Sequence, residues 1–306
     1  MLVQRDVVVD PVLSNVSIKF SNAEFIADRI MPILRVKKQT GVYYTYDKSN
    51  FRRDTTLRAG GSPANEVEFG LSTSSFVCQD HALKEFVDDL VRDQADAPLN
   101  PMIDATENLT EKMMIDREKT LALVMADTGE LSKNTTLSGT DQWDDYTNSD
   151  PITDVRTART SVHTNTFKKP NTLVLSKEVF DILADHPQII ERIKYSQLGV
   201  ITEELMARVF QVERILVGEA GENTATEGAT DVLAYIWGKH AQIVYVSPRV
   251  GIKMLTFGVT FTYKSRQVKR WRDEDREGTF IRVGQDNYVQ TIITDLAAYL
   301  IKNAIS

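Results

Sequence analysis

The clearest pattern of apolar and polar positions in this chain is a helical one over residues 100–127. Asn100 can cap the helix, Pro101 suits its first turn, and Gly129 lies just past its end. At about 1.5 Å per residue the helix measures roughly 40 Å. Charged residues fill the other faces of this helix. The apolar side chains that recur at near-helical spacing are Met102, Leu109, Met113, Leu121 and Val124. This length fits any helix that lines a core, so the segments around it decide its role.

Strand-forming residues dominate residues 41–77, which precede the helix. They form one run over residues 42–46 and a second over residues 67–76, with a turn composition at residues 59–63 between them. We predict a long two-stranded hairpin whose arms reach roughly 50 Å. A ribbon of this kind cannot bury both faces within its own subunit. It therefore either lies on a partner or folds flat on its own domain.

The remaining N-terminal segments are short. Residues 1–20 alternate apolar and polar side chains, which predicts an extended arm. An arm of this kind is usually a frayed end, although its apolar content suggests docking on a neighbour. We predict a short helix over residues 22–30, stopped by Pro32, and a strand over residues 33–36. Residues 81–91 predict a second short helix, with an apolar stripe of Ala82, Leu83, Phe86, Val87 and Leu90.

The pattern changes after the long helix. Residues 131–148 are rich in Ser, Thr, Asn, Gly and Asp and predict a loop that contains Trp143. Predicted helices and strands then alternate, which indicates a small α/β lobe. The helices begin at Asp150, Ser176 and Thr202, and the strands are residues 172–175, 215–217 and 242–246. From residue 259 onwards the runs favour strands, including residues 279–283 and 288–293.

Composition bounds the class of protein. The chain has 306 residues, 42% of them apolar and 26% charged, which suits a folded protein with two lobes. The net charge of -7 argues against a surface that binds nucleic acid or anionic lipid all over. With a single cysteine, Cys78, no disulfide can form within the chain, and no stretch approaches the length of a membrane span.

No pattern in the chain points to catalysis. Glycines do not form a dinucleotide or phosphate loop, and there is no nucleophile-elbow pentapeptide. The four histidines are scattered, and Cys78, three residues before His81, fits packing better than a nucleophile. Asp144 and Asp145 fit a solvated loop better than a cation site. We therefore expect no catalytic residue, no metal site and no cofactor.

Charged residues of both signs gather in residues 264–277, around Trp271. Mixed signs fit ion pairs between subunits or a solvated face better than a nucleic-acid groove. A second charged group lies near the expected tip of the hairpin. Together they supply the candidate subunit contacts, which are Arg52, Arg53, Arg58, Glu66, Glu68, Lys269, Arg270, Arg272, Asp273 and Glu274.

Several short segments occur in an order along the chain that can be compared with known families. Residues 25–32 (FIADRIMP), 41–48 and 66–79 precede the long helix, and residues 170–175 (PNTLVL) precede a helix and His186. In this order and in length, the chain resembles the major capsid proteins of tailed phages, over most of its extent. The resemblance implies an α+β chain with the Hong Kong 97 (HK97)-like capsid fold.

That resemblance implies a division of the chain into five parts. They are an N-terminal arm at residues 1–40, an extended β-hairpin loop at 41–80, a peripheral domain at 81–150 with a spine helix at 100–127, an α/β axial domain at 151–250, and a return to the peripheral domain at 251–306. Some relatives crosslink through a lysine and an asparagine. Lys48 is the only lysine in residues 41–80, and we do not expect that chemistry here.

The implied function is that of a structural protein rather than an enzyme. Copies of the chain are expected to assemble through hexamers and pentamers into an icosahedral phage head around double-stranded DNA. The arm is too short to include a scaffolding segment, which implies a separate scaffolding protein or an already processed chain. The other implied partner is a portal; DNA is held by non-specific contact and no membrane is involved. Assembly is expected in the host cytoplasm, and the product is the virion capsid. The alternatives are a cargo-enclosing compartment with the same fold, or an α/β enzyme with a pocket in residues 131–246.

Overall fold

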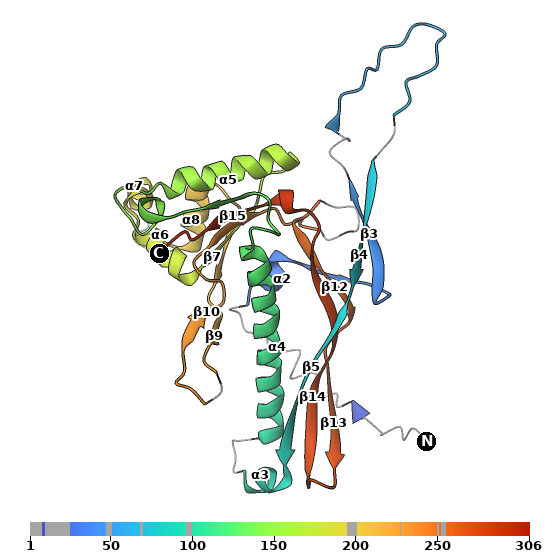
Figure 1. The fold of residues 1–306 in the computed structure, drawn as a ribbon, viewed down its shortest axis with the longest axis vertical. Coiled ribbons are helices and arrows are strands. Elements are labelled where there is room, and N and C mark those ends of the chain that lie inside the picture. The colour runs from blue at the N-terminus through green and yellow to red at the C-terminus, as the bar shows by residue number, and fades with distance from the viewer. Residues whose placement is uncertain are drawn as a thin grey trace.

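The computed structural model describes residues 8–9, 25–46, 51–67, 70–95, 100–194, 201–226, 228–249, 251 and 255–306. Figure 1 shows an elongated molecule with three parts: a lobe of helices and strands on one side, a long helix beside a sheet below it, and a thin hairpin that projects away from both. The two sheets and the long helix between them build the body of the molecule.

The predicted long helix is confirmed as α4, Pro101–Ala126. The Asn100 side chain caps it by accepting hydrogen bonds from the backbone N–H groups of Met102 at 3.2 Å and Ile103 at 3.4 Å. Buried positions recur every three or four residues from Ala105 to Met125. The helix therefore contacts protein along its whole length.

Six strands form the larger sheet, in the order β1-β13-β14-β12-β2 with β5 also paired to β14. The central strand, β14, bends at Gln285, which has a φ of 58°, and its pairing with β5 shifts register there. The two strands predicted over residues 279–283 and 288–293 are thus parts of the single strand β14. The strands are β1 (Val8–Val9), β2 (Ile33–Arg35), β5 (Gln79–Asp88), β12 (Gly258–Lys264), β13 (Gln267–Asp273) and β14 (Gly278–Ile292).

The predicted helix over residues 81–91 is wrong. Residues 79–88 form β5, and the helix that follows, α3 (Asp89–Gln94), begins only after the Asp88 side chain caps it. The apolar positions fit a helical period, but β14 offers a long row of backbone groups to which this segment pairs from Gln79 to Asp88. Tertiary pairing thus overrides the local pattern.

The two predictions for the N-terminal region, a short helix and a docking arm, have different outcomes. The short helix is present as α2, Ala27–Ile30, and the strand after it is β2. Residues 22–24 of the predicted helix lie outside the described residues. Of the extended segment predicted over residues 1–20, the structure describes β1, which pairs with β13 of the same chain, Val8 opposite Arg270. This part of the arm therefore docks on its own sheet.

The predicted hairpin is confirmed as an antiparallel pair, β3 (Thr40–Tyr46) and β4 (Leu71–Val77). Each strand is seven residues long, shorter than predicted. Residues 51–67 form no strand and make the thin loop that extends farthest from the body in Figure 1. On one face of the hairpin, Phe76 stacks on Phe261 of β12 with ring centroids 4.1 Å apart. This contact anchors the base of the hairpin to β12.

The smaller, five-stranded sheet builds the α/β lobe. Its order is β6-β15-β11-β7-β8, and β7 and β8 are parallel, as alternating helices and strands predict. Asp150, Ser176 and Thr202 cap their helices as expected. The strands are β6 (Asn134–Thr136), β7 (Thr172–Ser176), β8 (Arg214–Gly218), β11 (Ala241–Val244) and β15 (Ala298–Lys302). The helices are α5 (Pro151–Thr166), α6 (Lys177–Asp185), α7 (Pro187–Ile193) and α8 (Glu203–Phe210).

The remaining short elements border this lobe. The expected loop over residues 131–148 holds β6 and the one-turn helix η2 (Gly139–Asp141), and it buries Trp143 completely. A small hairpin, β9 (Gly221–Asn223) with β10 (Leu233–Tyr235), projects from the lobe, and η3 (Asp295–Ala297) precedes β15. Because β15 pairs with β11, the last strand of the chain belongs to the five-stranded sheet.

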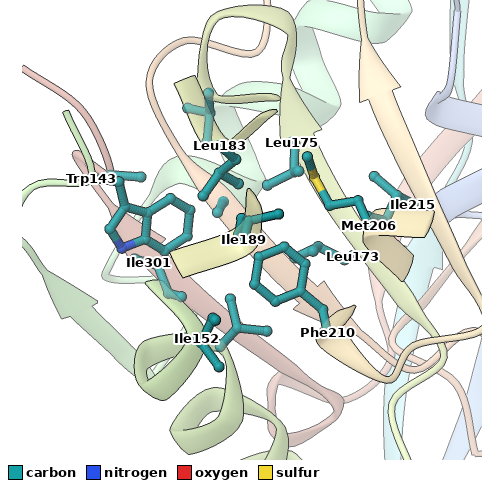
Figure 2. Close-up of a cluster of buried hydrophobic side chains, with 14 of the residues drawn as sticks. Trp143, Ile152, Leu173, Leu175, Leu183, Ile189, Met206, Phe210, Ile215 and Ile301 are labelled. Atoms are coloured by element: carbon teal, nitrogen blue, oxygen red, sulfur yellow. The ribbon is translucent and has the colours of Figure 1, made fainter. Parts of the chain in front are cut away.

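The core of the lobe lies between the five-stranded sheet and its helices. Figure 2 shows Leu173 of β7 beside Phe210 of α8 and Leu175 beside Met206, with Trp143 and Ile301 on one side of the cluster. A second core on the opposite face of the same sheet packs Leu121 and Met125 of α4. The long helix therefore belongs to both parts of the body at once.

Candidate functional site

The residues weighed as catalytic candidates serve packing and local structure. Cys78 is fully buried, its thiol lies 3.5 Å from the Phe261 carbonyl oxygen, and burial raises its pKa, which keeps it protonated. His81 stacks on Tyr288 with ring centroids 4.3 Å apart. Among the described residues, no group of three or more His, Cys, Asp and Glu side chains could hold a metal ion, and no helix is long and apolar enough to span a membrane.

The two loop aspartates are occupied by donors of their own chain. Asp145 accepts hydrogen bonds from the backbone N–H groups of Thr147 and Asn148 and from the Asn148 amide, which lower its pKa. Asp144 accepts hydrogen bonds from the backbone N–H and the hydroxyl of Ser306. Both carboxylates therefore order a loop and the chain end.

The charged candidates on the projecting loop are all exposed. Arg52, Arg53, Arg58 and Glu66 point into solvent, and Glu68 lies outside the described residues. Within the loop, Arg58 Nη1 donates to the Ser62 carbonyl oxygen at 3.2 Å. The structure thus brings three guanidinium groups onto one projecting segment that has no acidic partner for them among the described residues.

The candidates in residues 264–277 are sorted by strand alternation onto two faces of β13. Arg270 and Arg272 lie on the face toward α4, while Lys269, Trp271 and Asp273 lie on the other. Arg272 pairs with Asp89 at 2.6 Å and with Glu274 at 2.8 Å. The ion pairs expected between subunits are therefore made within one chain for Arg272 and Glu274.

The face of the six-stranded sheet turned away from α4 carries a row of aromatic rings next to a row of cationic side chains. Trp271, Phe280 and Phe86 lie side by side on β13, β14 and β5, with neighbouring ring centroids 5.4 and 5.0 Å apart. Gly278 makes room for the Phe86 ring, since a Cβ there would lie 2.3 Å from it. The next row holds the cations Lys269, Arg282 and Lys84. Sequence reasoning missed this face because its members come from three separate strands.

The base of the hairpin presents apolar surface. Val42, Tyr44 and Val77 share the hairpin face opposite Phe76 and are 59%, 45% and 55% exposed. A groove of ≈ 430 Å³ runs beside them, and its lining includes apolar side chains such as Leu34 as well as Lys37 and Lys38. Exposed apolar side chains on a projecting two-stranded ribbon suit contact with another protein surface rather than chemistry on a small molecule.

The small β9–β10 hairpin adds a further exposed apolar surface. Leu233 is 82% exposed and Val232 is 55% exposed. Glu222 on the other strand of this hairpin forms an ion pair with Lys119 of α4 at 2.7 Å. Nothing in the local sequence pattern distinguished these residues from a buried strand.

Comparison with known proteins gives a consistent result. A family model described as phage major capsid protein E matches residues 109–241. The major capsid protein of Burkholderia phage BcepMu is 32% identical over 303 residues, which cover 96% of this chain and 96% of that protein. The major capsid protein of Pseudomonas phage JBD67 is also 32% identical, with 97% of each chain covered.

Solved structures of phage-related proteins also resemble this chain. A phage-related protein from Bordetella bronchiseptica is 27% identical, covers 97% of this chain and 98% of its own, and superposes with a TM-score of 0.76. The capsid structure of cyanophage P-SCSP1u has 9% identity, with 89% of this chain and 86% of that one covered and a TM-score of 0.62. The second likeness concerns the fold alone.

Proposed function

Because the chain belongs to the family of phage major capsid proteins, with the HK97-like fold of that family, we propose that it builds the closed shell of a phage head by self-assembly. The observation that carries this proposal is the projecting hairpin with its loop. Its side chains Val42, Tyr44 and Leu57 are exposed, so the subunit alone leaves this segment without a partner surface. Neighbouring copies in a shell would supply one.

We assign the parts of the chain on this basis. Residues 41–80 act as the extended loop, and the six-stranded sheet with α4 acts as the peripheral domain. The five-stranded sheet, with β15 included, acts as the axial domain, where copies meet to form hexamers and pentamers. The support is the separation of the two sheets and the single long helix that contacts both cores.

The partners beyond the chain itself are a scaffolding protein, a portal and packaged double-stranded DNA. A net charge of -7 favours non-specific contact with DNA through local patches rather than a surface that binds it throughout. Assembly would take place in the host cytoplasm. Neither the described residues nor the comparisons favour a cargo compartment or an enzyme with a pocket in residues 131–246.

The loop arginines offer a mechanism for assembly. Arg52, Arg53 and Arg58 are exposed on the segment that extends farthest from the body, and we assign them to ion pairs with acidic groups of a neighbouring subunit. Exposed ion pairs are worth about 0.2 to 1 kcal/mol each, which is too little to unfold a domain. Repeated at every contact of a shell, such pairs still decide whether the shell forms.

Negative-stain microscopy and sedimentation of the purified chain test the function, side by side with the variant Arg52→Glu, Arg53→Glu, Arg58→Glu. The parent is expected to form capsomers or closed shells, and the variant is expected to keep its circular dichroism spectrum but remain unassembled. A matched variant with lysine at the same three positions keeps the charge and should assemble. If the parent stays monomeric across salt and protein concentration, both with and without a candidate scaffolding protein, the shell function is contradicted. A Glu variant that assembles normally would contradict the role of the arginines alone.

A further inference from the structure

Among the described residues, a pair of aromatic rings joins the projecting loop, residues 51–67, to the body of its own subunit. The Phe51 and Phe167 rings have centroids 5.1 Å apart and meet edge to face at 62°. Among the described residues, no hydrogen bond or ion pair joins residues 52–67 to the rest of the chain, and the three side-chain hydrogen bonds of this segment stay inside it. The ring pair is therefore a specific side-chain contact between the described loop and the body.

The position of Phe167 is unusual for a bulky residue. It follows the last turn of α5 with φ 52° and ψ 22°, the left-handed conformation that glycine usually supplies at the end of a helix. Its backbone N–H closes the helix by donating to the His163 carbonyl oxygen at 2.7 Å. Glycine would adopt the same backbone conformation without strain. The turn itself therefore does not require the phenyl ring of Phe167.

Neither ring is buried in a core. Phe51 is 63% exposed and Phe167 is 61% exposed, so the contact is made at the surface, where the loop leaves the body. In Figure 1 one end of α5 points toward the base of the projecting loop. A surface pair of this kind favours the closed over the open arrangement by roughly two- to tenfold. It is strong enough to bias the direction of a loop and weak enough to release it.

We propose that Phe51 and Phe167 are positioning residues for assembly: their contact forms a latch that holds the start of the loop against α5 in the free subunit and sets its direction before it meets a neighbour. The proposal rests on the shell function. A loop that already points toward its docking site loses less conformational freedom on binding than one that swings freely. The latch therefore speeds assembly without adding any contact between subunits.

A dye on the loop reports the latch in the free subunit. The variant Thr56→Cys places a reactive thiol on the exposed loop, whereas the native Cys78 is fully buried. In this background, Phe51→Ala and Phe167→Gly each remove one ring, and the glycine variant also relieves the left-handed turn, so α5 stays folded. Dye anisotropy is expected to fall in both variants, and the double variant is expected to fall no further, since either ring alone is without its partner.

Two matched variants separate the latch from a general change in the loop. Leu57 is 85% exposed in the same segment, so Leu57→Ala should leave the anisotropy unchanged. Phe167→Tyr keeps a ring at the helix end and should behave like the parent.

The assembly rate, followed by light scattering, decides whether the latch positions the loop. We expect it to fall roughly two- to tenfold in Phe51→Ala and Phe167→Gly. Unchanged anisotropy in both variants overturns the latch, and lower anisotropy with an unchanged or faster assembly rate overturns its positioning role. A parent that never assembles instead contradicts the shell function, while the anisotropy comparison still reports on the latch.

Discussion

At the scale of single residues, His186 shows how burial gives a side chain a pH-dependent role. The imidazole is fully buried, Nδ1 accepts a hydrogen bond from the Gln188 backbone N–H at 3.3 Å, and Nε2 lies 3.2 Å from the Ser149 hydroxyl. Burial lowers the pKa of His186, although Asp150 opposes this. The residue therefore caps α7 in its neutral form, with the proton on Nε2.

Acid should weaken the lobe that contains His186. Because the unfolded chain binds a proton more readily than the folded one, the free energy of unfolding should decrease as the pH falls below about 6.5, by at most about 1.4 kcal/mol per pH unit from this residue. His186→Asn keeps a capping acceptor and does not titrate, so its melting temperature should depend less on pH over this range. Identical pH profiles for parent and variant would show that His186 does not contribute.

Gln242, unlike His186, is a buried polar residue whose side chain makes no hydrogen bond among the described residues. It lies on β11 with 1% exposure, between Val174 and Leu300 on the neighbouring strands, and neither its amide oxygen nor its nitrogen finds a hydrogen-bond partner among the described residues. Burying an unsatisfied amide costs about 1 to 3 kcal/mol.

Gln242→Met removes that cost with little change in side-chain volume. We expect the free energy of unfolding to rise by about 1 to 2 kcal/mol, read from urea denaturation. Gln188 serves as the control, since its amide donates to the Ser149 carbonyl oxygen at 3.2 Å and Gln188→Met should destabilise. A destabilised Gln242→Met protein would mean that the amide has a partner after all.

Glu118 explains why some residues could not be found from the sequence. It is fully buried on α4 and accepts hydrogen bonds from the backbone N–H groups of Ile26 and Ala27 and from Trp237 Nε1, at 3.0, 2.9 and 2.7 Å. These donors lie 91 to 119 residues away along the chain. Caps such as Asn100 and Ser176 were predictable because their partners lie within three residues, whereas the partners of Glu118 depend on the fold.

At the scale of elements, the helix and the hairpin were predictable and β5 was not. α4 carries its own cap and its own periodic apolar face, so local sequence determines it. β5 exists because β14 pairs with it over ten residues, with Phe86 opposite Phe280 and Val87 opposite Thr279. Its apolar positions fit either structure, and only the neighbouring strand decides between them.

The buried face of α4 gives an element-scale prediction. Leu109 is 4% exposed in a core with Ile281, whereas Leu123 on the same helix is 62% exposed. Leu109→Ala should lower the free energy of unfolding by about 2 to 5 kcal/mol through lost contacts and the cavity left behind. Leu123→Ala should change it by about 0.5 kcal/mol or less. Equal urea midpoints for the two variants would contradict the burial pattern described for this helix.

At the scale of the whole molecule, the fold class and the long-range order of segments were predictable, and the assignment of the chain end was not. The order of arm, hairpin, long helix and α/β lobe follows from patterns along the chain. The final strand, Ala298–Lys302, crosses back to the five-stranded sheet, and its apolar run fits either sheet equally well. The rows of rings and cations on the outer sheet face likewise arise only once three strands are paired.

The central claim is that the projecting loop is completed by neighbouring subunits. Hydrogen–deuterium exchange of the backbone amides in residues 51–67 tests this directly, with free subunits compared with assembled shells. In the free subunit these amides should exchange rapidly, because the loop is exposed and has few hydrogen bonds. In shells they should be strongly protected, while amides in the buried strand β7 should be protected in both states. Equally rapid exchange of the loop in shells would contradict the account.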